Sequence, residues 1–581
     1  AMINAPIIDD KLAIRISADF RKSDGFNRNI TLNKDDIDSE SNVDLRGKVL
    51  FEPSKDFKNL ITVSYSKRRE GENFVDDLDP FARLSFGNIE TSRETDNLST
   101  VLDSEITLND NWSIKNLTSF STTELDSLRG LNASRTFEQS DISQSDAKQT
   151  SDIFTEELRL HYKDNKLKAH VGVYYSNDKR TEDLNAIARS SDAQLREGFL
   201  DVLTPGDLAG LAFFGFGVDD LVGLYSGLTT SALNQEDVKA DNYAAFTEFS
   251  FDYSTFLTIF GGLRYDVYRE ERKNRFNRNE FSNIAALANP NSCLHPALVA
   301  ACTGINGGIN GLFANIDPGT RKSDSDALLP SIGVNLNWTE DLATGFSVKR
   351  GFRAGGGGIT PINGTVFDYD SEFVWNYELS FRSQWFDKKL TVNANAFFLD
   401  WTDQQVSVRE DINSGLSSIP GLDNNRIENA GRSEVRGFEI EAFAQPTDEL
   451  SLRGSVGYTE TEFKEFTNNG VNFAGNEFPF APEWTLSGSA HYMFANGIYL
   501  HGNVNYQSEV FSDARNSQDR VLDARTIVNA KVGYKKDNID AYVFATNLFD
   551  EEYLESVSRS TSTVITGAGQ AFGVRVNIKL D

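Results

Sequence analysis

Residues 11–20, KLAIRISADF, are the stretch of sequence that decides the fold. The even-numbered residues from 12 to 20 are all apolar, whereas Arg15 and Asp19 lie between them. A period of two places successive side chains on opposite faces of a β-strand, while a helix would scatter the apolar residues around its axis. The closing stretch FGVRVNIKL, residues 572–580, repeats the pattern. Both ends of the chain are therefore predicted to be strands with one apolar and one polar face.

The same alternation recurs along the whole chain and predicts twenty strands in all. They are expected near residues 11–22, 41–51, 58–69, 95–108, 112–125, 148–162, 166–180, 237–252, 256–271, 325–338, 341–352, 373–386, 389–402, 432–445, 449–462, 482–493, 497–509, 523–535, 538–549 and 567–580.

The connections between these strands alternate in length. Short turns, such as 163–166, 253–255 and 535–538, separate long connections, such as 181–236 and 272–324. Short turns on one side and long loops on the other are typical of outer-membrane barrels, where they lie on the periplasmic and extracellular sides. The sequence therefore predicts an all-β fold, a large antiparallel transmembrane β-barrel, with the apolar residues of 11–20 facing lipid.

Composition agrees with this class of fold and excludes others. The chain has 581 residues and a net charge of -29, which would repel a phosphate backbone, so no nucleic-acid partner is expected. No apolar run approaches the roughly 18 to 20 residues that a spanning helix needs. The mean hydropathy of -0.40 is compatible with a barrel because only alternate residues face lipid.

Aromatic residues lie where the predicted strands meet their connections. Amphipathic rings suit the two interfaces of a membrane, although aromatic residues also favour strands in general. They are Tyr65, Trp112, Tyr162, Tyr265, Trp338, Trp375, Trp401, Tyr458, Trp484, Tyr506 and Tyr542.

Several stretches of the chain have a distinctive sequence. The stretches LLPSIGVNLNWTEDL at 328–342 and SVKRGFRAGGG at 347–357 resemble a region of TonB-dependent receptors, in which a strand ends in a basic-aromatic-Arg-Ala-Gly-Gly turn. FATNLFDEEY at 544–553 and AFGVRVNIKL at 571–580 resemble the family's last hairpin. The likeness runs along essentially the whole chain, in the family's order.

The resemblance implies a 22-stranded barrel in the full-length protein, with its lumen filled by an N-terminal plug domain. Such receptors lie in the bacterial outer membrane, in contact with its lipid, and bind scarce small molecules, most often ferric siderophores, for uptake energised by TonB. Residues 1–581 would then be the barrel domain, incomplete at the N-terminus. AMINAPI, residues 1–7, would be the tail of the second barrel strand. The plug, the first strand and the region that contacts TonB are expected to precede it.

Other functions remain open at this stage. A passive porin-like channel, an adhesin, or a receptor for a vitamin or an oligosaccharide would share the same alternation. Upstream sequence separates them, because a plug with a TonB-contacting segment marks an energised receptor.

The candidate ligand-binding residues flank one pair of long loops: Arg350, Arg353, Tyr369, Trp375 and Arg409. Guanidinium groups and aromatic rings suit an anionic, catechol-like ferric complex through bidentate hydrogen bonds and cation-π contacts. Packing of the loops and of the aromatic girdle would account for the same residues equally well. We expect that Arg353→Ala weakens binding more than a comparable substitution at Arg180.

Cys293 and Cys302 are the two cysteines of the chain, and both lie in a long connection predicted to be extracellular. Because the periplasm through which the chain passes is oxidising, we expect them to form a disulfide.

Catalytic residues, metal ligands and cofactors are not expected. The five histidines lack metal-ligand spacing, and no Gly-x-Ser-x-Gly elbow is present. The acidic run at 35–40 matches no calcium loop. The glycines at 355–358 lack the Lys-Ser/Thr ending of a phosphate loop and are predicted to be a flexible turn at the end of a strand.

Overall fold

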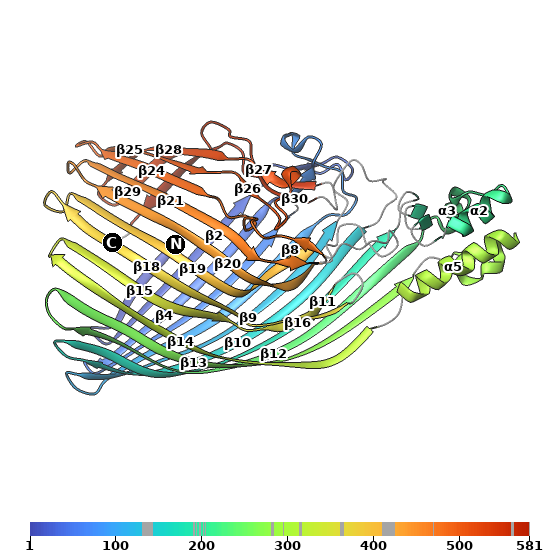
Figure 1. Cartoon of the computed structure of the whole chain (residues 1–581). Coiled ribbons are helices and arrows are strands. Elements are labelled where there is room, and N and C mark those ends of the chain that lie inside the picture. The colour runs from blue at the N-terminus through green and yellow to red at the C-terminus, as the bar shows by residue number, and fades with distance from the viewer. Residues whose placement is uncertain are drawn as a thin grey trace.

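A single antiparallel sheet of twenty-one strands curls into a barrel with a helical cap at one end (Figure 1). The structure is a computed structural model. It describes residues 1–579 with the exception of 72, 131–142, 190, 191, 193, 194, 197, 198, 201, 202, 204, 281–283, 294, 313–315, 361–364, 410–424, 469 and 559–562.

All twenty predicted strands are present in the sheet, and the N-terminal residues add a further strand, β1. The bounds are β1 Met2–Ile8, β2 Leu12–Ser23, β4 Glu40–Ser54, β5 Phe57–Glu70, β8 Ser92–Thr107, β9 Trp112–Gly130, β10 Ser143–Lys163, β11 Leu167–Arg189, β12 Thr229–Asp252, β13 Leu257–Glu280, β14 Ile316–Thr339, β15 Leu342–Arg353, β18 Glu372–Trp385, β19 Leu390–Arg409, β20 Asn425–Ala444, β21 Leu450–Glu465, β24 Trp484–Met493, β25 Ile498–Gln507, β28 Arg525–Lys536, β29 Ile539–Thr546 and β32 Ala571–Ile578.

Each strand pairs with its neighbours in chain order, so the sheet is a meander. Short turns join β1 to β2, β4 to β5 and every second pair thereafter, and these turns gather at the left of Figure 1. The turn at 164–166 shows how they are held: the Asp164 carboxylate accepts hydrogen bonds from the backbone N–H groups of Leu167 and Lys166, at 2.7 and 2.8 Å. These bonds lower the pKa of Asp164 because they favour its charged form.

The two faces of the sheet differ in polarity as the alternation predicts. Lys115 of β9 and Lys349 of β15 line a cavity of about 680 Å³ within the ring, so their face is the inner one. The cross-strand pairs can be followed from Lys115 through β8, β5 and β4 to β2. They place Ile14 and its partner Val49 on the opposite, outer face. The even-numbered residues from 12 to 20 therefore lie on the outer face.

Several strands are much longer than the sequence predicts. β12, β13 and β14 each have 24 residues, whereas a bilayer needs about 9 to 11 tilted residues. The extra residues lie beyond the apolar band, towards the long connections, and include charged residues on both faces of the sheet. The apolar alternation therefore stops there, while the backbone hydrogen bonds between the strands continue. The predicted connections 181–236 and 272–324 are shortened accordingly, because strands occupy their ends.

A helical cap fills two of the long connections, beyond the ends of β11 to β14 (Figure 1). It consists of α2 Pro205–Phe213, α3 Val218–Tyr225, α4 Ala285–Ala288, the 3-10 turn η2 Pro290–Cys293 and α5 Pro296–Leu312. Phe199 and Tyr225 from the first connection pack with Ile305 from the second in a shared apolar core. The Tyr225 hydroxyl donates a hydrogen bond of 2.6 Å to Asn306. Among the described helices, no single one is long and apolar enough to cross a membrane, although the bent pair α2 and α3 passes that test jointly.

Cys293 and Cys302 are joined by a disulfide inside this cap. The bridge ties η2 to α5, and both cysteines are buried in the shared core. We predict that replacing both cysteines with serine destabilises the cap by about 2 to 3 kcal/mol, since the bridge closes a short loop. In the full-length protein, limited proteolysis should then cut the cap faster while heat-modifiable migration of the barrel stays unchanged. If the variant lost heat-modifiable migration together with its resistance to proteolysis, the cap would not be independent of the barrel.

The remaining short elements lie in the long connections. They are β3 Arg28–Asn29, β6 Phe74–Asp76, η1 Pro80–Ala82, β7 Leu84–Ser85, β16 Gly356–Ile359, β17 Val366–Tyr369, β22 Thr467–Asn468, β23 Val471–Asn472, β26 Val510–Phe511, η3 Gln518–Arg520, β27 Val521–Leu522, β30 Leu554–Ser558 and β31 Thr563–Thr566.

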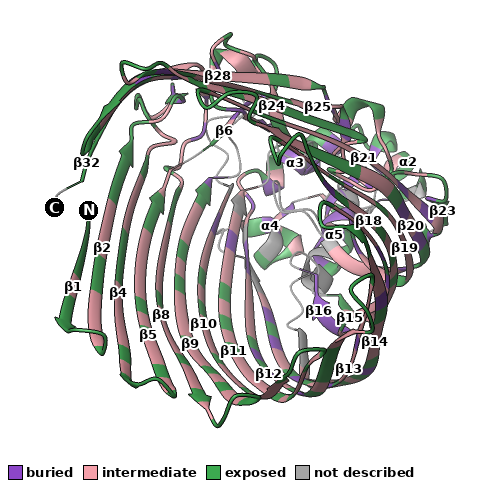
Figure 2. Ribbon diagram, turned by 90° about the vertical axis from the view of Figure 1, so that its left-hand side faces the viewer, coloured by how far each residue is buried: buried purple, intermediate pink, exposed green. Residues whose placement is uncertain are grey.

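The sheet has two edges. Within the described residues β1 pairs only with β2, and β32 pairs only with β29. Both edges and both chain ends lie on the same side of the ring (Figure 2).

Candidate ligand-binding site

The connection between β15 and β18 folds into the barrel as a β-hairpin formed by β16 and β17. Figure 2 shows β16 inside the ring of strands, and the hairpin contacts β13 on one side and β20 on the other. Residues 356–360 are buried. The prediction of a flexible turn at 355–358 is therefore wrong, because three of these glycines belong to a packed strand.

Close packing explains why glycine occupies these positions. A Cβ atom at Gly357 would lie 2.3 Å from the Asp368 carboxylate, and one at Gly356 would lie 2.7 Å from the Tyr369 hydroxyl. Both distances are far shorter than a non-bonded contact allows, and the Cβ at Gly357 would also lie 2.7 Å from the backbone carbonyl oxygen of Phe367. A side chain at 357 would therefore push β16 and β17 apart. The glycine run permits a thin hairpin that fits against the inner wall.

Side chains of the barrel wall fix the hairpin in place. Arg321 of β14 donates hydrogen bonds to two hairpin carbonyl groups and pairs with Asp368 at 2.8 Å. On the other side, Gln405 of β19 donates to the carbonyl oxygen of Asp370 at 3.2 Å, and Asn429 of β20 exchanges two hydrogen bonds with the Asp370 backbone. The hairpin therefore bridges two parts of the wall and narrows the lumen at its long-loop end.

A cluster of charged groups faces the hairpin from β11, β12 and β13. The Arg272 guanidinium lies 2.8 Å from Glu236 and 2.8 Å from Glu270, and Arg180 lies 3.2 Å from Glu236. The Arg272, Glu236 and Glu270 side chains are 12%, 14% and 9% exposed. Tyr369 lies within electrostatic range of this cluster, and burial raises its pKa while Arg272 opposes the rise. Its hydroxyl stays protonated at neutral pH and can donate a hydrogen bond.

The structure separates the five predicted ligand-binding residues. Arg353 lies on the inner face, 3.9 Å from Glu372, and Tyr369 lies in the inward hairpin. Arg350 pairs across strands with Trp375 on the outer face, where its guanidinium stacks 4.2 Å from the Phe373 ring. These two residues therefore belong to the outer aromatic belt.

Arg409 ends β19, and its side chain lies outside the described residues. Arg180, proposed above as a comparison for Arg353, belongs to the charged cluster and is no neutral control.

The residues missed at the sequence level are Arg272, Glu236, Glu270 and Arg321. A usable signal existed, because charged or hydroxyl-bearing residues occupy the even positions from 264 to 272 of β13 without a break. Such a run marks an inner face that stays polar well beyond the bilayer.

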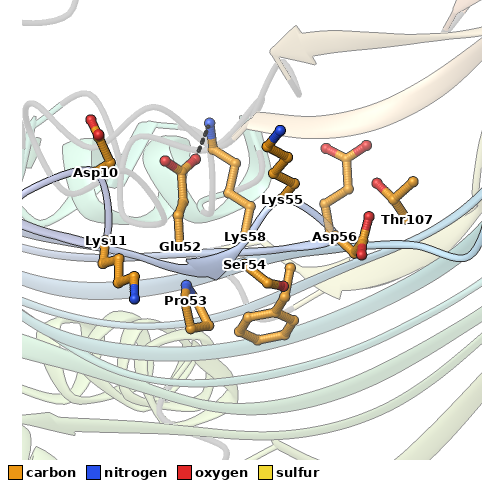
Figure 3. Close-up of a pocket in the computed structure, with 11 residues that line it drawn as sticks. Asp10, Lys11, Glu52, Pro53, Ser54, Lys55, Asp56, Lys58 and Thr107 are labelled. Carbon is orange, nitrogen blue, oxygen red and sulfur yellow. Dashed lines mark ion pairs between the residues drawn. The ribbon is translucent and has the colours of Figure 1, made fainter.

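A second hollow of about 550 Å³ lies at the opposite end, among the short turns (Figure 3). Asp10, Lys55 and Asp56 line it, and Lys58 pairs with Glu52 at 3.1 Å. Its charged lining suits solvent or a polar protein surface. No group of three or more potential metal ligands occurs among the residues that the structure describes.

Comparison with known proteins places the chain in a family. It matches the family described as "TonB dependent receptor-like, beta-barrel" over residues 33–548. Among curated proteins, it is 26% identical over 278 residues to the metal-pseudopaline receptor CntO of Pseudomonas aeruginosa, covering 47% of this chain and 36% of that protein. It is 24% identical over 268 residues to the pesticin receptor of Yersinia enterocolitica, covering 45% and 37%. The matched region thus spans about a third of these relatives.

Solved structures show the same fold. The ferric yersiniabactin uptake receptor FyuA from Yersinia pestis has a TM-score of 0.75 at 17% identity, covering 99% of this chain and 77% of that chain. The ferric-catecholate import receptor Fiu from E. coli K12 has a TM-score of 0.68 at 14% identity, covering 99% and 79%. The family match over residues 33–548 shows that the chain belongs to the β-barrel family of TonB-dependent receptors, and the fold agrees with it.

Proposed function

We propose that the protein is an outer-membrane receptor that binds a ferric siderophore from outside the cell and takes it up with energy supplied through TonB. The observation that carries this proposal is the family match over residues 33–548. Several relatives and structural neighbours bear the names of siderophore or metal receptors, among them a ferric-pyoverdine receptor and the catecholate receptor Fiu. The fold also supplies what binding requires, a polar lumen narrowed at its long-loop end.

The ligand would meet the hairpin and the guanidinium groups beside it. Most of these groups are tightly paired, since Arg272 and Arg321 each lie 2.8 Å from a carboxylate. Arg353 is the exception, because its side chain is 63% exposed and its contact with Glu372 is 3.9 Å long. It is therefore the cation most available to an anionic ferric complex, with the Tyr369 hydroxyl as a neighbouring donor.

We predict that Arg353→Ala weakens binding of a ferric tris-catechol complex by roughly 10- to 30-fold, as loss of one charge-assisted hydrogen-bonding group does. The matched control is Arg382→Ala, on the inner face of β18 near its short turn. Titration of plug-containing receptor with the complex, followed by fluorescence quenching, measures both. Equal losses in the two variants would show that the long-loop end does not hold the ligand.

The open edges of the sheet lead to a second part of the proposal. Unpaired backbone groups in hydrocarbon cost several kcal/mol each, so β1 and β32 require partners in a membrane. We propose that a further strand closes the ring between them and that a plug domain occupies the lumen in the complete receptor.

Residues 1–581 expressed alone test this directly. We predict that they form no heat-modifiable closed barrel and support no TonB-dependent import. Co-expression with an upstream segment containing a strand and a plug should restore both properties. Import by residues 1–581 alone would contradict this part of the proposal.

A further inference from the structure

The outer face of the barrel carries one band of polar residues where the rest of the wall is apolar. On the strands far from it, the outward rows consist of large apolar side chains, among them Leu328, Ile332, Phe346, Leu379, Leu486, Val504, Val543 and Val574. On β5, β8, β9 and β10 the corresponding outward positions include Asn59, Ser104, Asn116, Thr118 and Glu156. We name these five residues the polar stripe.

Cross-strand register makes the stripe continuous. Asn59 pairs with Ser104, and Ser104 pairs with Asn116 on the next strand. Thr118 then pairs with Glu156 of β10. The stripe therefore crosses four neighbouring strands.

The face of the stripe follows from its neighbours. Lys115, one residue before Asn116, lines the inner cavity, and alternation turns Asn116 outward. Trp112 and Tyr162, 4.8 Å apart, mark the short-turn end of the same outer rows. Phe120 and Phe154 pair on the far side of Glu156. The stripe thus lies between aromatic residues at both ends, at the depth of the hydrocarbon.

Hydrogen bonds within the stripe hold its groups in defined positions. Asn59 donates to the Ser104 hydroxyl at 2.7 Å, Thr118 donates to the Glu156 carboxylate at 2.6 Å, and the Asn116 amide also donates to Glu156. Glu156 therefore accepts hydrogen bonds from two side chains of the neighbouring strand. A hydrogen-bonded carboxyl group in the lipid-facing wall is costly to the barrel, and a polar group at that depth is a candidate functional site.

An apolar groove adjoins the stripe. The groove has a volume of about 460 Å³. Glu156 lines it together with the outward side chains Leu158, Val173, Tyr175, Tyr243 and Tyr265 and their neighbours. Leu158 and Val173 are 46% and 55% exposed. The outer wall here thus combines a recess for apolar side chains with a line of hydrogen-bonding groups.

We propose that the polar stripe and the adjoining groove form an interface with a second copy of this chain within the membrane. The stripe is complementary to itself, because it carries amide and hydroxyl donors beside a carboxylate acceptor. A two-fold interface brings the same patch of both copies together. Each amide group of Asn59 and Asn116 has a second N–H beyond the hydrogen bond described above, and that N–H can donate to a hydroxyl or carboxyl oxygen of the facing stripe. Lipid tails offer the Glu156 carboxylate no hydrogen-bond donor, whereas the amides of a facing stripe do.

Cross-linking tests the proposal in native outer membranes. The described chain has no free cysteine, so Leu102→Cys, beside Thr118 on the outer face, supplies a single thiol-reactive position. A short bis-maleimide should yield a covalent dimer. The matched control, Ile332→Cys, places the thiol on a distant outer row with 57% exposure and should remain monomeric. Equal yields at the two positions would overturn the proposal.

A second pair of variants separates association from folding. Combining Asn116→Leu with Glu156→Leu in the Leu102→Cys background should lower the dimer yield at least 10-fold. Heat-modifiable migration should be unchanged, because leucine suits the lipid-facing wall. Undiminished cross-linking would overturn the proposal, as would a cross-linked product whose partner differs in mass from this chain.

Discussion

Replacing Arg272 with methionine is expected to destabilise the folded protein by about 3 to 5 kcal/mol, because removing one partner leaves buried charges uncompensated. Arg272 is the shared cation of Glu236 and Glu270, and all three side chains are at most 14% exposed. Without it, two carboxylates face each other behind the inward hairpin. Guanidinium unfolding of the plug-containing receptor in lipid vesicles gives the loss of stability, and hydrogen exchange at 356–369 reports whether the hairpin loosens.

Lys273→Met is the matched control for this prediction. The residue adjoins Arg272 but points outward, so its replacement removes the same charge from a partly exposed position. We expect a change below about 0.5 kcal/mol, as for most surface substitutions. Adding Glu236→Gln and Glu270→Gln to the Arg272 variant should recover part of the stability. If Arg272→Met and Lys273→Met behave alike, the cluster does not hold the hairpin.

Arginine substitutions at two adjacent residues of β14 should give very different losses of stability, because one residue faces lipid and the other faces the lumen. Ile332→Arg puts a guanidinium into hydrocarbon and is expected to cost about 2 to 4 kcal/mol, whereas Ser331→Arg puts the same group into the polar lumen at a cost of about 1 kcal/mol or less. Ser331 lines the inner cavity, and Ile332 is 57% exposed on the opposite face. Folding of the plug-containing receptor into vesicles of defined lipid, measured at equilibrium, gives both values. A reversed order would mean that the register is shifted by one residue, since such a slip inverts every side chain.

Sequence alone was sufficient for the barrel because each strand in the bilayer must alternate. The signal weakens where lipid ends: β13 and β14 continue beyond the predicted boundaries with charged residues on both faces. The helical cap could not be predicted from the sequence, because its core joins two connections that are far apart in sequence. The cap helices are short, so their helical periodicity is weaker than the loop-like composition of the surrounding residues, which predicts a loop.

The site was predicted only in part for a similar reason. Arg350 and Arg353 were grouped because they are close in sequence, yet a separation of three puts them on opposite faces of β15. Strand parity would have divided them, and it would also have drawn attention to Arg272. The inward fold of the hairpin has no local signal except the glycine run, which is equally compatible with a turn.

The shared core of the helical cap has a consequence for how this receptor can diversify. Extracellular loops ordinarily accept insertions and deletions one at a time, because each loop packs mainly on itself. Here Tyr225 from one loop donates a hydrogen bond to Asn306 from the other, and Phe199 packs edge-on against Tyr225 with the ring centroids 5.2 Å apart. A change of length in either loop would displace residues of the second. The two segments should therefore evolve as one unit, and a graft that transfers surface specificity to another barrel would have to carry both.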